Sequence, residues 1–301
     1  MYVNQRRTPV PGPHNILHIQ DVYKEYSDKS ILDNIDLSVA HGEFCTVVGP
    51  SGCGKSTLLR LILGQEVATK GTVLIDGVPA SFANKDRGIV YQKYSLFPHL
   101  SVLENVLLGK KLSSPRSEWK MHRQEAMEFL SAAGLCQHAN KYPHELSGGM
   151  QQRVAVMQAL IMKPKILLMD EPFGALDPGT RESIQLFLLE QWKKYNMTIF
   201  FVTHDLEEAV FLGSRLLVIS QYYTDDRGPN ANRGSKIVAD HCIKHIDDIQ
   251  ESVAEKTTAE FGQLIEEIRH EGFDPKHIQH ASTFKLNHKH SFQTLTPEEM
   301  N

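Results

Sequence analysis

The sequence has few cysteines, no long apolar run and no excess of positive charge. Its four cysteines, Cys45, Cys53, Cys136 and Cys242, show no CxxC or CxxH spacing. This spacing argues against a disulfide framework or zinc ribbon and favours a reducing compartment. No stretch approaches the ~18 consecutive apolar residues of a membrane-spanning helix, so we expect the chain itself not to cross a membrane. Residues 1–18 lack the apolar segment of an export signal, so we expect no export.

Charge and length narrow the class further. The chain has 32 Lys and Arg against 36 Asp and Glu, a formal charge of −4 over 301 residues. Proteins that bind mainly a nucleic-acid backbone usually carry a basic excess, so we expect no nucleic-acid partner. The length and the apolar fraction of 41% allow one large domain with an appendage.

Strand-like and helical patterns alternate along the first 220 residues. A strand-rich region precedes a glycine-rich turn and a helix that ends at Gly64, and residues 100–160 are mostly helical. The predicted strands lie at 16–19, 31–39, 44–48, 71–76, 88–91, 166–169 and 198–202, and the predicted helices include 55–63 and 181–194. This alternation predicts an α/β protein with a mostly parallel sheet.

The composition changes after residue 220. We predict a polar loop over 222–234 between strands at 215–220 and 236–239, then a charged helix over 251–270. From residue 274 the chain is polar, and we expect a poorly ordered tail. Four histidines in it suggest either a metal site or a solvated tail, and their irregular spacing favours the tail: His277, His280, His288 and His290.

A phosphate-binding loop is the most specific motif. Residues 49–56 fit G-x-x-x-x-G-K-[ST] between a buried strand and a helix. Glycines let backbone N–H groups face phosphates, and the positive end of the helix favours an anion. We predict that Lys55 reaches the β- and γ-phosphates and that Ser56 binds Mg²⁺. The predicted nucleotide-binding residues are Gly49, Pro50, Ser51, Gly52, Cys53, Gly54, Lys55, Ser56 and Thr57.

Two carboxylates end the apolar strand at 166–169. Ligands of parallel sheets lie beyond the carboxyl ends of strands, so Asp170 is a candidate for the Mg²⁺ shell and Glu171 for the base that activates water. By themselves such residues are as often ordinary surface carboxylates. Together with the phosphate loop they predict a nucleoside triphosphatase. Cys53 within that loop is either an oxidisable thiol or a small filler residue, and the filler is favoured.

A further segment narrows the class. Leu146-Ser147-Gly148-Gly149-Met150-Gln151-Gln152-Arg153 resembles the signature sequence of ABC transporter ATPases. Other motifs of that family match in order: Gln92 is similar to the Q-loop glutamine, Asp177 to the D-loop aspartate and His204 to the switch histidine. Tyr26 is similar in placement to the aromatic residue that stacks on adenine, with Tyr23 as a competitor and a strand-packing role as the alternative.

The resemblance implies a fold and its domains. It covers about residues 16–240 and implies a P-loop NTPase core of the RecA-like type, with a mostly parallel sheet. An N-terminal antiparallel β subdomain and an α-helical signature subdomain at about 93–160 complete it. Outside it we expect an N-terminal extension over 1–15, a helical C-terminal extension over 241–273 and the tail over 274–301.

The resemblance also implies a mechanism. Two copies would pair head to tail, with ATP between the phosphate loop of one and Ser147, Gly148 and Gly149 of the other. Glu171 would be the general base, His204 would contact the γ-phosphate, and Asp177 would communicate across the dimer. Gln92 would contact Mg²⁺ or the water and sense the transmembrane partner. The implied cofactors are ATP and Mg²⁺, with Ser56, Gln92 and Asp170 as metal ligands.

Two kinds of ABC protein fit. Residues 94–100, 142–145 and 171–178 look most like importers of nitrate, sulfonate and taurine, and the loop at 220–228 is similar to relatives linked to urea- or guanidine-type nitrogen compounds. Residues 157–160 depart from the family's Ala-Arg-Ala-Leu. An importer subunit would bind permease subunits at the cytoplasmic face of the membrane, and indirectly a solute-binding protein. The alternative is a soluble ABC ATPase acting on DNA or ribosomes, which generally has two cassettes or a coiled-coil insertion.

Overall fold

The computed structural model describes residues 15–80, 85–93, 95–228, 231–243 and 259–293. The chain forms two compact units, Met1–Ala83 with Phe200–Asn301, and Asn84–Ile199. The predicted N-terminal extension, the first part of the predicted helix at 251–270 and the last residues of the tail lie outside the described residues, apart from Asn15. Among the residues that are described, no helix is long and apolar enough to cross a membrane.

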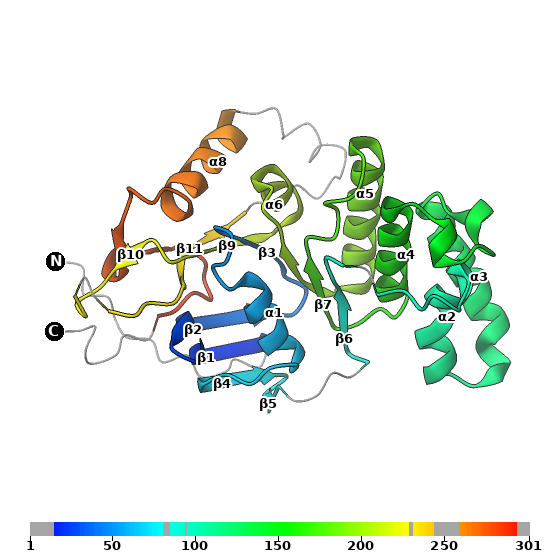
Figure 1. The fold of residues 1–301 in the computed structure, drawn as a ribbon, viewed down its shortest axis with the longest axis horizontal. Helices are drawn as coiled ribbons and strands as arrows, with labels where there is room; N and C mark the ends of the chain where they lie inside the picture. Colours follow the sequence, from blue (N-terminus) through cyan, green and yellow to red (C-terminus); the bar gives the residue numbers. More distant parts are fainter. Residues whose placement is uncertain (1–14, 81–84, 94, 229–230, 244–258, 294–301) are drawn as a thin grey trace. The chain divides into compact units, whose positions relative to one another are not determined.

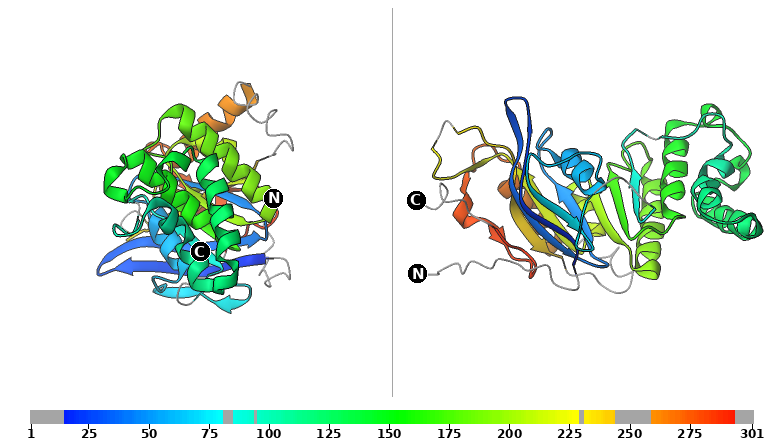
Figure 2. Two further views of the ribbon diagram at one scale, coloured as in Figure 1. Left: turned by 90° about the vertical axis from the view of Figure 1, so that its right-hand side faces the viewer. Right: turned by 90° about the horizontal axis from the view of Figure 1, so that it is seen from below.

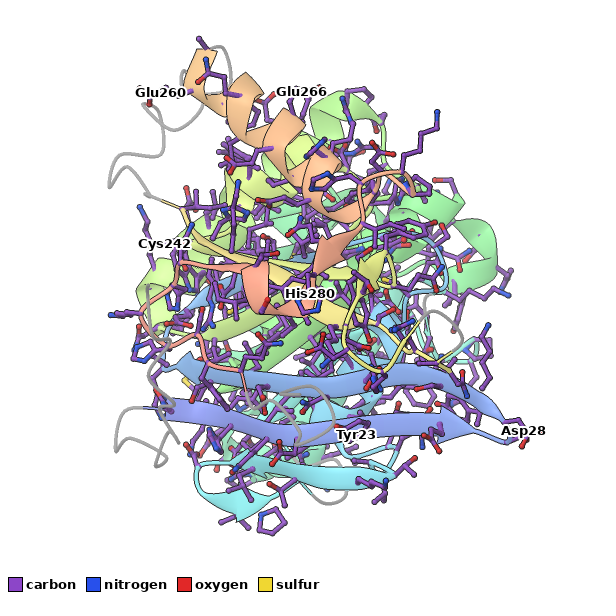
Figure 3. All side chains as sticks on the ribbon, turned by 90° about the vertical axis from the view of Figure 1, so that its left-hand side faces the viewer. Tyr23, Asp28, Cys242, Glu260, Glu266 and His280 are labelled. Carbon is purple, nitrogen blue, oxygen red and sulfur yellow. The ribbon has the colours of Figure 1, made fainter. Side chains whose placement is uncertain are left out.

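The first unit contains an antiparallel sheet of four strands in the order β2-β1-β4-β5. Inward-facing residues such as Ile19 and Leu37 lie opposite one another and are buried. The hairpin turns at Ser27, whose φ is 51°, and Figure 3 shows Asp28 at its tip. The predicted antiparallel subdomain is thereby confirmed. Its strands are β1 (Asn15–Tyr26), β2 (Lys29–Ala40), β4 (Lys70–Ile75) and β5 (Val78–Pro79).

Four further strands of the first unit belong to one sheet and position the phosphate loop. These four run in the order β13-β11-β9-β3. The strands β3 and β9 are parallel and fully buried, as their continuous apolar sequences predict. Helix α1 (Lys55–Leu63) follows β3 and ends at Gly64 with φ 77°, as predicted. The strands are β3 (Phe44–Val48), β9 (Arg215–Ser220), β11 (Lys236–Cys242) and β13 (Lys285–Leu286).

One buried arginine joins three strands of this unit. The guanidinium of Arg215 donates to both carboxylate oxygens of Asp240, at 2.9 and 2.7 Å, and to Glu43 at 3.1 Å. It also donates to the carbonyl of Ser38 at 2.6 Å. Burial lowers the pKa of Arg215, but Asp240 raises it more, so the side chain stays charged. The charge is therefore satisfied inside the unit.

Helices α6 (Leu206–Leu212) and α8 (Ala259–Gly272) pack together on this sheet. Ala209 and Val210 of α6 share one apolar cluster with Ile265 and Ile268 of α8 and with Val48 of β3. Figure 1 shows α8 in orange beside α6, and Figure 3 shows Glu260 and Glu266 along α8. The predicted charged helix is confirmed from residue 259, and it continues two residues beyond the predicted end.

The tail corrects an expectation. We expected poor order from residue 274, but 279–286 form β12 (Gln279–His280), the short 3₁₀ helix η4 (Ala281–Thr283) and β13. The backbone N–H groups of Asn287 and His288 donate to the carbonyl of Asp240, and Ala281 is buried. Main-chain bonds to β11 hold this segment, and a polar composition does not reveal such bonds.

The predicted polar loop at 222–234 is also more structured than its composition indicates. It contains β10 (Tyr223–Thr224), which pairs in parallel with β12. The carboxylate of Asp225 accepts hydrogen bonds from Arg227 and Arg233. Burial raises the pKa of Asp225, but the two arginines lower it more, so its net pKa lies well below the usual value. Ion pairs therefore fix this loop.

The second unit contains two parallel strands and the predicted helical region. Strand β6 (Arg87–Val90) pairs with β7 (Ile166–Asp170). Ser101 and Glu104 form a capping box at the start of α2, which stops the helix from fraying. Figure 2 shows the green helices of this unit. They are α2 (Val102–Ser113), α3 (Trp119–Ala132), α4 (Gly148–Leu160) and α5 (Pro178–Tyr195), with short 3₁₀ turns η1 (Arg116–Glu118), η2 (Cys136–His138) and η3 (Pro143–Glu145).

Strand β8 (Thr198–Val202) contains the boundary between the units, since the second unit ends at Ile199. All five of its residues are buried, as its apolar sequence predicts.

Candidate nucleotide site

The phosphate loop of the first unit has the backbone that an anion site requires. Gly54 caps α1 with φ 90°, a left-handed conformation that side chains rarely adopt. A Cβ on Gly49 would overlap the carbonyl oxygen of Ile219 in β9. Both glycines are therefore needed for the loop to turn from β3 into the N-terminus of α1, where N–H groups and the helix dipole favour phosphate.

Lys55 lies over the loop that it follows. Its ammonium donates to the carbonyls of Gly49 and Pro50, at 2.8 and 2.9 Å, and the residue is only 9% exposed. Burial raises the pKa of the Cys53 thiol, and Lys55 lowers it less. A protonated, buried thiol is a poor nucleophile, which agrees with Cys53 as a filler residue. Ser56 and Thr57 follow in the first turn of α1.

Tyr26 lies at the end of β1 and is 42% exposed. Its hydroxyl donates to Glu66, and Lys24 lies 4.8 Å from its ring centre. Burial and the Glu66 carboxylate raise the pKa of the phenol. The Nζ of Lys70, in the neighbouring strand β4, lies 5.7 Å from the ring centre of the competitor Tyr23, which is half-buried. A lysine thus lies near both rings, and the greater exposure of Tyr26 makes it the better residue for stacking on a base.

His204, the predicted switch histidine, lies just after β8 in the first unit and is exposed. The residue before it is buried, and Asp205 after it caps α6 by accepting from the N–H of Glu208. The backbone on both sides of His204 is thus held while its ring faces outward.

The second unit brings two predicted site residues together. The amide nitrogen of Gln92 donates to the carboxylate of Glu171 at 3.3 Å. Glu171 has φ 47°, a costly conformation for a residue other than glycine, and such strain concentrates at functional sites. Asp170 ends β7 and is half-buried. The side-chain amide of Gln92, which is predicted to contact Mg²⁺ or water, therefore also orients the carboxylate of Glu171, the predicted base.

The signature segment begins a helix with an exposed hydroxyl. Ser147 caps α4, and its Oγ accepts from the N–H of Met150 at 3.3 Å. A Cβ on Gly149 would come within 3.0 Å of the carbonyl of Ala175, so a glycine lets α4 pack closely on the segment before Asp177. The 13-residue helix begins with two glycines, and the dipole at its N-terminus favours an anion.

Asp177 caps α5 by accepting from the N–H of Thr180 at 3.0 Å. This hydrogen bond lowers the pKa of its carboxyl group. The residue predicted to communicate across a dimer is therefore also a local cap on the surface of its unit.

Sequence reasoning missed one buried carboxylate near His204. Glu207 and Glu208 look alike in the sequence, but Glu207 is exposed and Glu208 is 8% exposed. Glu208 lies on the inner side of α6, one turn after the cap, and this position in the helix is the signal that could have identified it as buried. Among the described residues, no three His, Cys, Asp or Glu side chains are grouped as a metal ligand set.

Comparisons with known proteins identify the family. Residues 32–174 match the sequence model of the ABC transporter family. An uncharacterized ABC transporter ATP-binding protein of Methanocaldococcus jannaschii is 48% identical over 190 residues, 63% of this chain and 70% of the relative. The nitrate import ATP-binding protein NrtD of Synechocystis is 47% identical over 63% of this chain and 70% of its own length. The taurine import ATP-binding protein TauB of Yersinia pestis is 42% identical over 68% and 80%.

Solved structures agree. A dimeric ATP-binding cassette in a post-hydrolysis state, bound to ADP and phosphate, has a TM-score of 0.64 and 32% identity, and covers 76% of this chain and all of that one. A Clostridium perfringens protein described as part of an ABC transporter complex has the same TM-score, 25% identity, and covers 84% and 99%. The predicted P-loop NTPase fold is confirmed. The chain belongs to the ABC transporter family, as an ATPase of the group of import ATP-binding subunits.

Proposed function

We propose that this chain hydrolyses ATP as a head-to-tail dimer on the cytoplasmic face of a membrane, and drives uptake of a small solute through separate permease subunits. The observation that carries the proposal is the pair of helix N-termini, one directly after the phosphate loop and one directly after Ser147. Each favours phosphate, and neither encloses it alone. The ATPase domain would be residues 16–240, with a signature subdomain at about 93–160 and a helical extension at 241–273.

ATP would bind to residues 49–57. The loop's N–H groups would surround the phosphates, and Lys55 would exchange its carbonyl partners for the β- and γ-phosphates, since a charge-assisted bond to phosphate is the stronger one. Tyr26 would stack on the adenine. Lys55 would thus bind the phosphates through its charge, and Tyr26 would bind the adenine through stacking.

The donor set also fits Mg²⁺. A magnesium ion bound to nucleotide needs few protein ligands, because phosphates and water fill most of its octahedral shell. The hydroxyl of Ser56, the carboxylate of Asp170 and the amide oxygen of Gln92 are oxygen donors of the kind it prefers. When bound, the ion would neutralise charge that develops on the phosphates.

Hydrolysis would need a base and a γ-phosphate contact. Glu171 would accept a proton from the attacking water, held in orientation by the hydrogen bond from Gln92. His204 would donate to the γ-phosphate, a role that suits an exposed imidazole on a fixed backbone. Transfer of the phosphate leaves ADP and inorganic phosphate as products.

The dimer would complete each site. Ser147, Gly148 and Gly149 of one copy would bind the γ-phosphate held by the other, and Asp177 would lie at the interface. The exposed Ser147 hydroxyl and the helix dipole of α4 supply the attraction. Hydrolysis removes the phosphate that links the copies, so the pair would open and pass the motion to the permease.

The solute would be nitrate, a sulfonate, taurine or a related nitrogen compound. The support is the identity of 42 to 47% with relatives named for nitrate and taurine import. A solute-binding protein would act through the permease. We expect no nucleic-acid partner, given the charge of −4. The alternative is a soluble ABC ATPase acting on DNA or ribosomes.

Copurification separates these functions. The tagged chain is recovered from native membranes in mild detergent, and its stoichiometric partners are identified. The proposal predicts a hydrophobic permease, and vesicles containing that complex should take up nitrate, a sulfonate or taurine only with ATP. Recovery solely with ribosomal or DNA-binding proteins would contradict the importer function.

A further inference from the structure

A hydrogen-bonded frame surrounds the switch histidine. The hydroxyl of Thr203 donates to the carboxylate of Glu208 at 2.6 Å and accepts from the N–H of Asp205 at 3.1 Å. The backbone N–H of Thr203 donates to the carbonyl of Val47 in β3 at 3.3 Å. One hydroxyl therefore joins the residues before and after His204, and the main chain ties the first of them to the strand that leads into the phosphate loop.

Burial makes this frame stiff. Thr203 is 2% exposed and Glu208 is 8% exposed, whereas His204 lies at the surface. A carboxylate withdrawn from water must be hydrogen-bonded, so the Thr203 hydroxyl is a strongly preferred partner. Threonine is also restricted at χ1, which fixes the direction of its hydroxyl. The backbone under the exposed ring has little freedom.

The helix that carries Glu208 is itself held from behind. Its neighbours Ala209 and Val210 pack on Ile265 and Ile268 of α8. An open cavity of about 610 Å³ is lined by residues 204–207 and by Ile265, Arg269 and Phe273. His204 therefore borders open space, while its backbone is anchored through Glu208.

We propose that Glu208 is a positioning residue for His204, acting through the hydroxyl of Thr203. The inference rests on the proposed function of His204 at the γ-phosphate. A donor to a transferring phosphate is effective only at the right distance, so a loosened backbone lowers turnover without removing the donor. Nucleotide binding depends on the phosphate loop and is left intact.

The test compares variants of the frame. Thr203→Val keeps the shape of the side chain and removes the hydroxyl, and we expect kcat for ATP to fall on the order of 100-fold with KM unchanged. Thr203→Ser restores the hydroxyl and should recover most of the turnover. Glu208→Gln keeps an acceptor oxygen and should lose less than Thr203→Val. Thr46→Val, which removes another buried hydroxyl, one bonded to the carbonyl of Arg215 at 3.3 Å, is the matched control and should keep kcat.

A double-mutant cycle shows whether the effect passes through the histidine. In single-turnover assays Thr203→Val should add little to the loss caused by His204→Ala, because both remove the same contact. Multiplied losses, or an unchanged kcat in Thr203→Val, would overturn the positioning role. An unchanged kcat in His204→Ala would instead contradict the proposed function. Should Thr203→Val fail to fold by circular dichroism, a full loss of turnover in folded Thr203→Ser would equally overturn the proposal.

Discussion

The phosphate loop and the C-terminal segment (residues 259–293) both contact strand β9. The loop contacts its backbone, whereas the C-terminal segment contacts its side chains. Gly49 of the loop touches the backbone of Ile219, and Gly272 at the end of α8 touches the side chain of Val218, with no room for a Cβ at either glycine. Ser220 Oγ, next along β9, donates to the carbonyl of Gly272 at 2.7 Å. The loop is built from backbone that must face a ligand, whereas the C-terminal segment is built from contacts to the rest of its unit. Only the first kind leaves a motif in the sequence.

Arg215→Met should show the largest loss of stability. It removes a buried charge paired with Asp240 and Glu43 and leaves two carboxylates without that partner, so we expect about 3–5 kcal/mol less unfolding free energy. ATP affinity of the folded protein should not change. Denaturant unfolding and nucleotide titration measure both quantities. The exposed Arg269→Met is the control, expected within about 0.5 kcal/mol of the parent.

Alanine substitutions at Gly49 and Gly272 should affect different properties, ATP binding in the first case and stability in the second. Gly49→Ala should weaken ATP binding on the order of 100-fold, because the loop must move to relieve the overlap of the new Cβ with the carbonyl oxygen of Ile219. Gly272→Ala should cost about 1–3 kcal/mol of stability by overpacking against Val218, with normal ATP affinity. Titration with a fluorescent ATP analogue and thermal unfolding distinguish them. Equal loss of ATP affinity in both variants would contradict the claim that only the phosphate loop serves nucleotide binding.

Deleting residues 274–301 should destabilise the chain without disabling the loop. The deletion removes β13, two main-chain bonds to Asp240 and the ion pair of Lys285 with Glu271, at 2.9 Å. At about 1 kcal/mol for each main-chain bond, we expect a loss on the order of 2 kcal/mol. ATP turnover of the folded fraction should persist. A collapse of turnover at temperatures where the protein remains folded would show that the tail serves the site.

The smallest expected effect is a dependence of the unfolding free energy on pH. Burial, with Arg215 nearby, lowers the pKa of His288 from 6.5 to about 4, although Glu43 lies 3.7 Å from its Nε2. Between these values the unfolded chain binds the proton and the folded chain does not. Stability should therefore fall as pH drops from about 6.5 towards 4, by on the order of 1 kcal/mol after allowance for solvent screening. In His288→Gln, unfolding free energy should depend less on pH there, and an identical slope would exclude this group.

The loop, the signature segment and the positions of the strands along the chain are easier to predict from the sequence than the structure of the C-terminal segment. Gly54 and Lys55 are dictated by local chemistry, since a left-handed turn and a phosphate each admit few residue types. The frame of Thr203 and Glu208 depends on which glutamate is buried, and the pairing of β13 with β11 depends on main-chain bonds. Both arise from tertiary packing, which residue types alone do not encode.

ATP-dependent pairing of Glu171→Gln tests the central claim most directly. Without its base the protein should bind ATP and Mg²⁺ but turn over at least about 100-fold more slowly, so the ATP-bound pair should accumulate. Light scattering with size-exclusion chromatography, in the presence of ATP and Mg²⁺, should show a dimer that disappears when Ser147→Arg blocks the signature. A monomer with ATP bound at saturation, or unchanged turnover, would contradict the account.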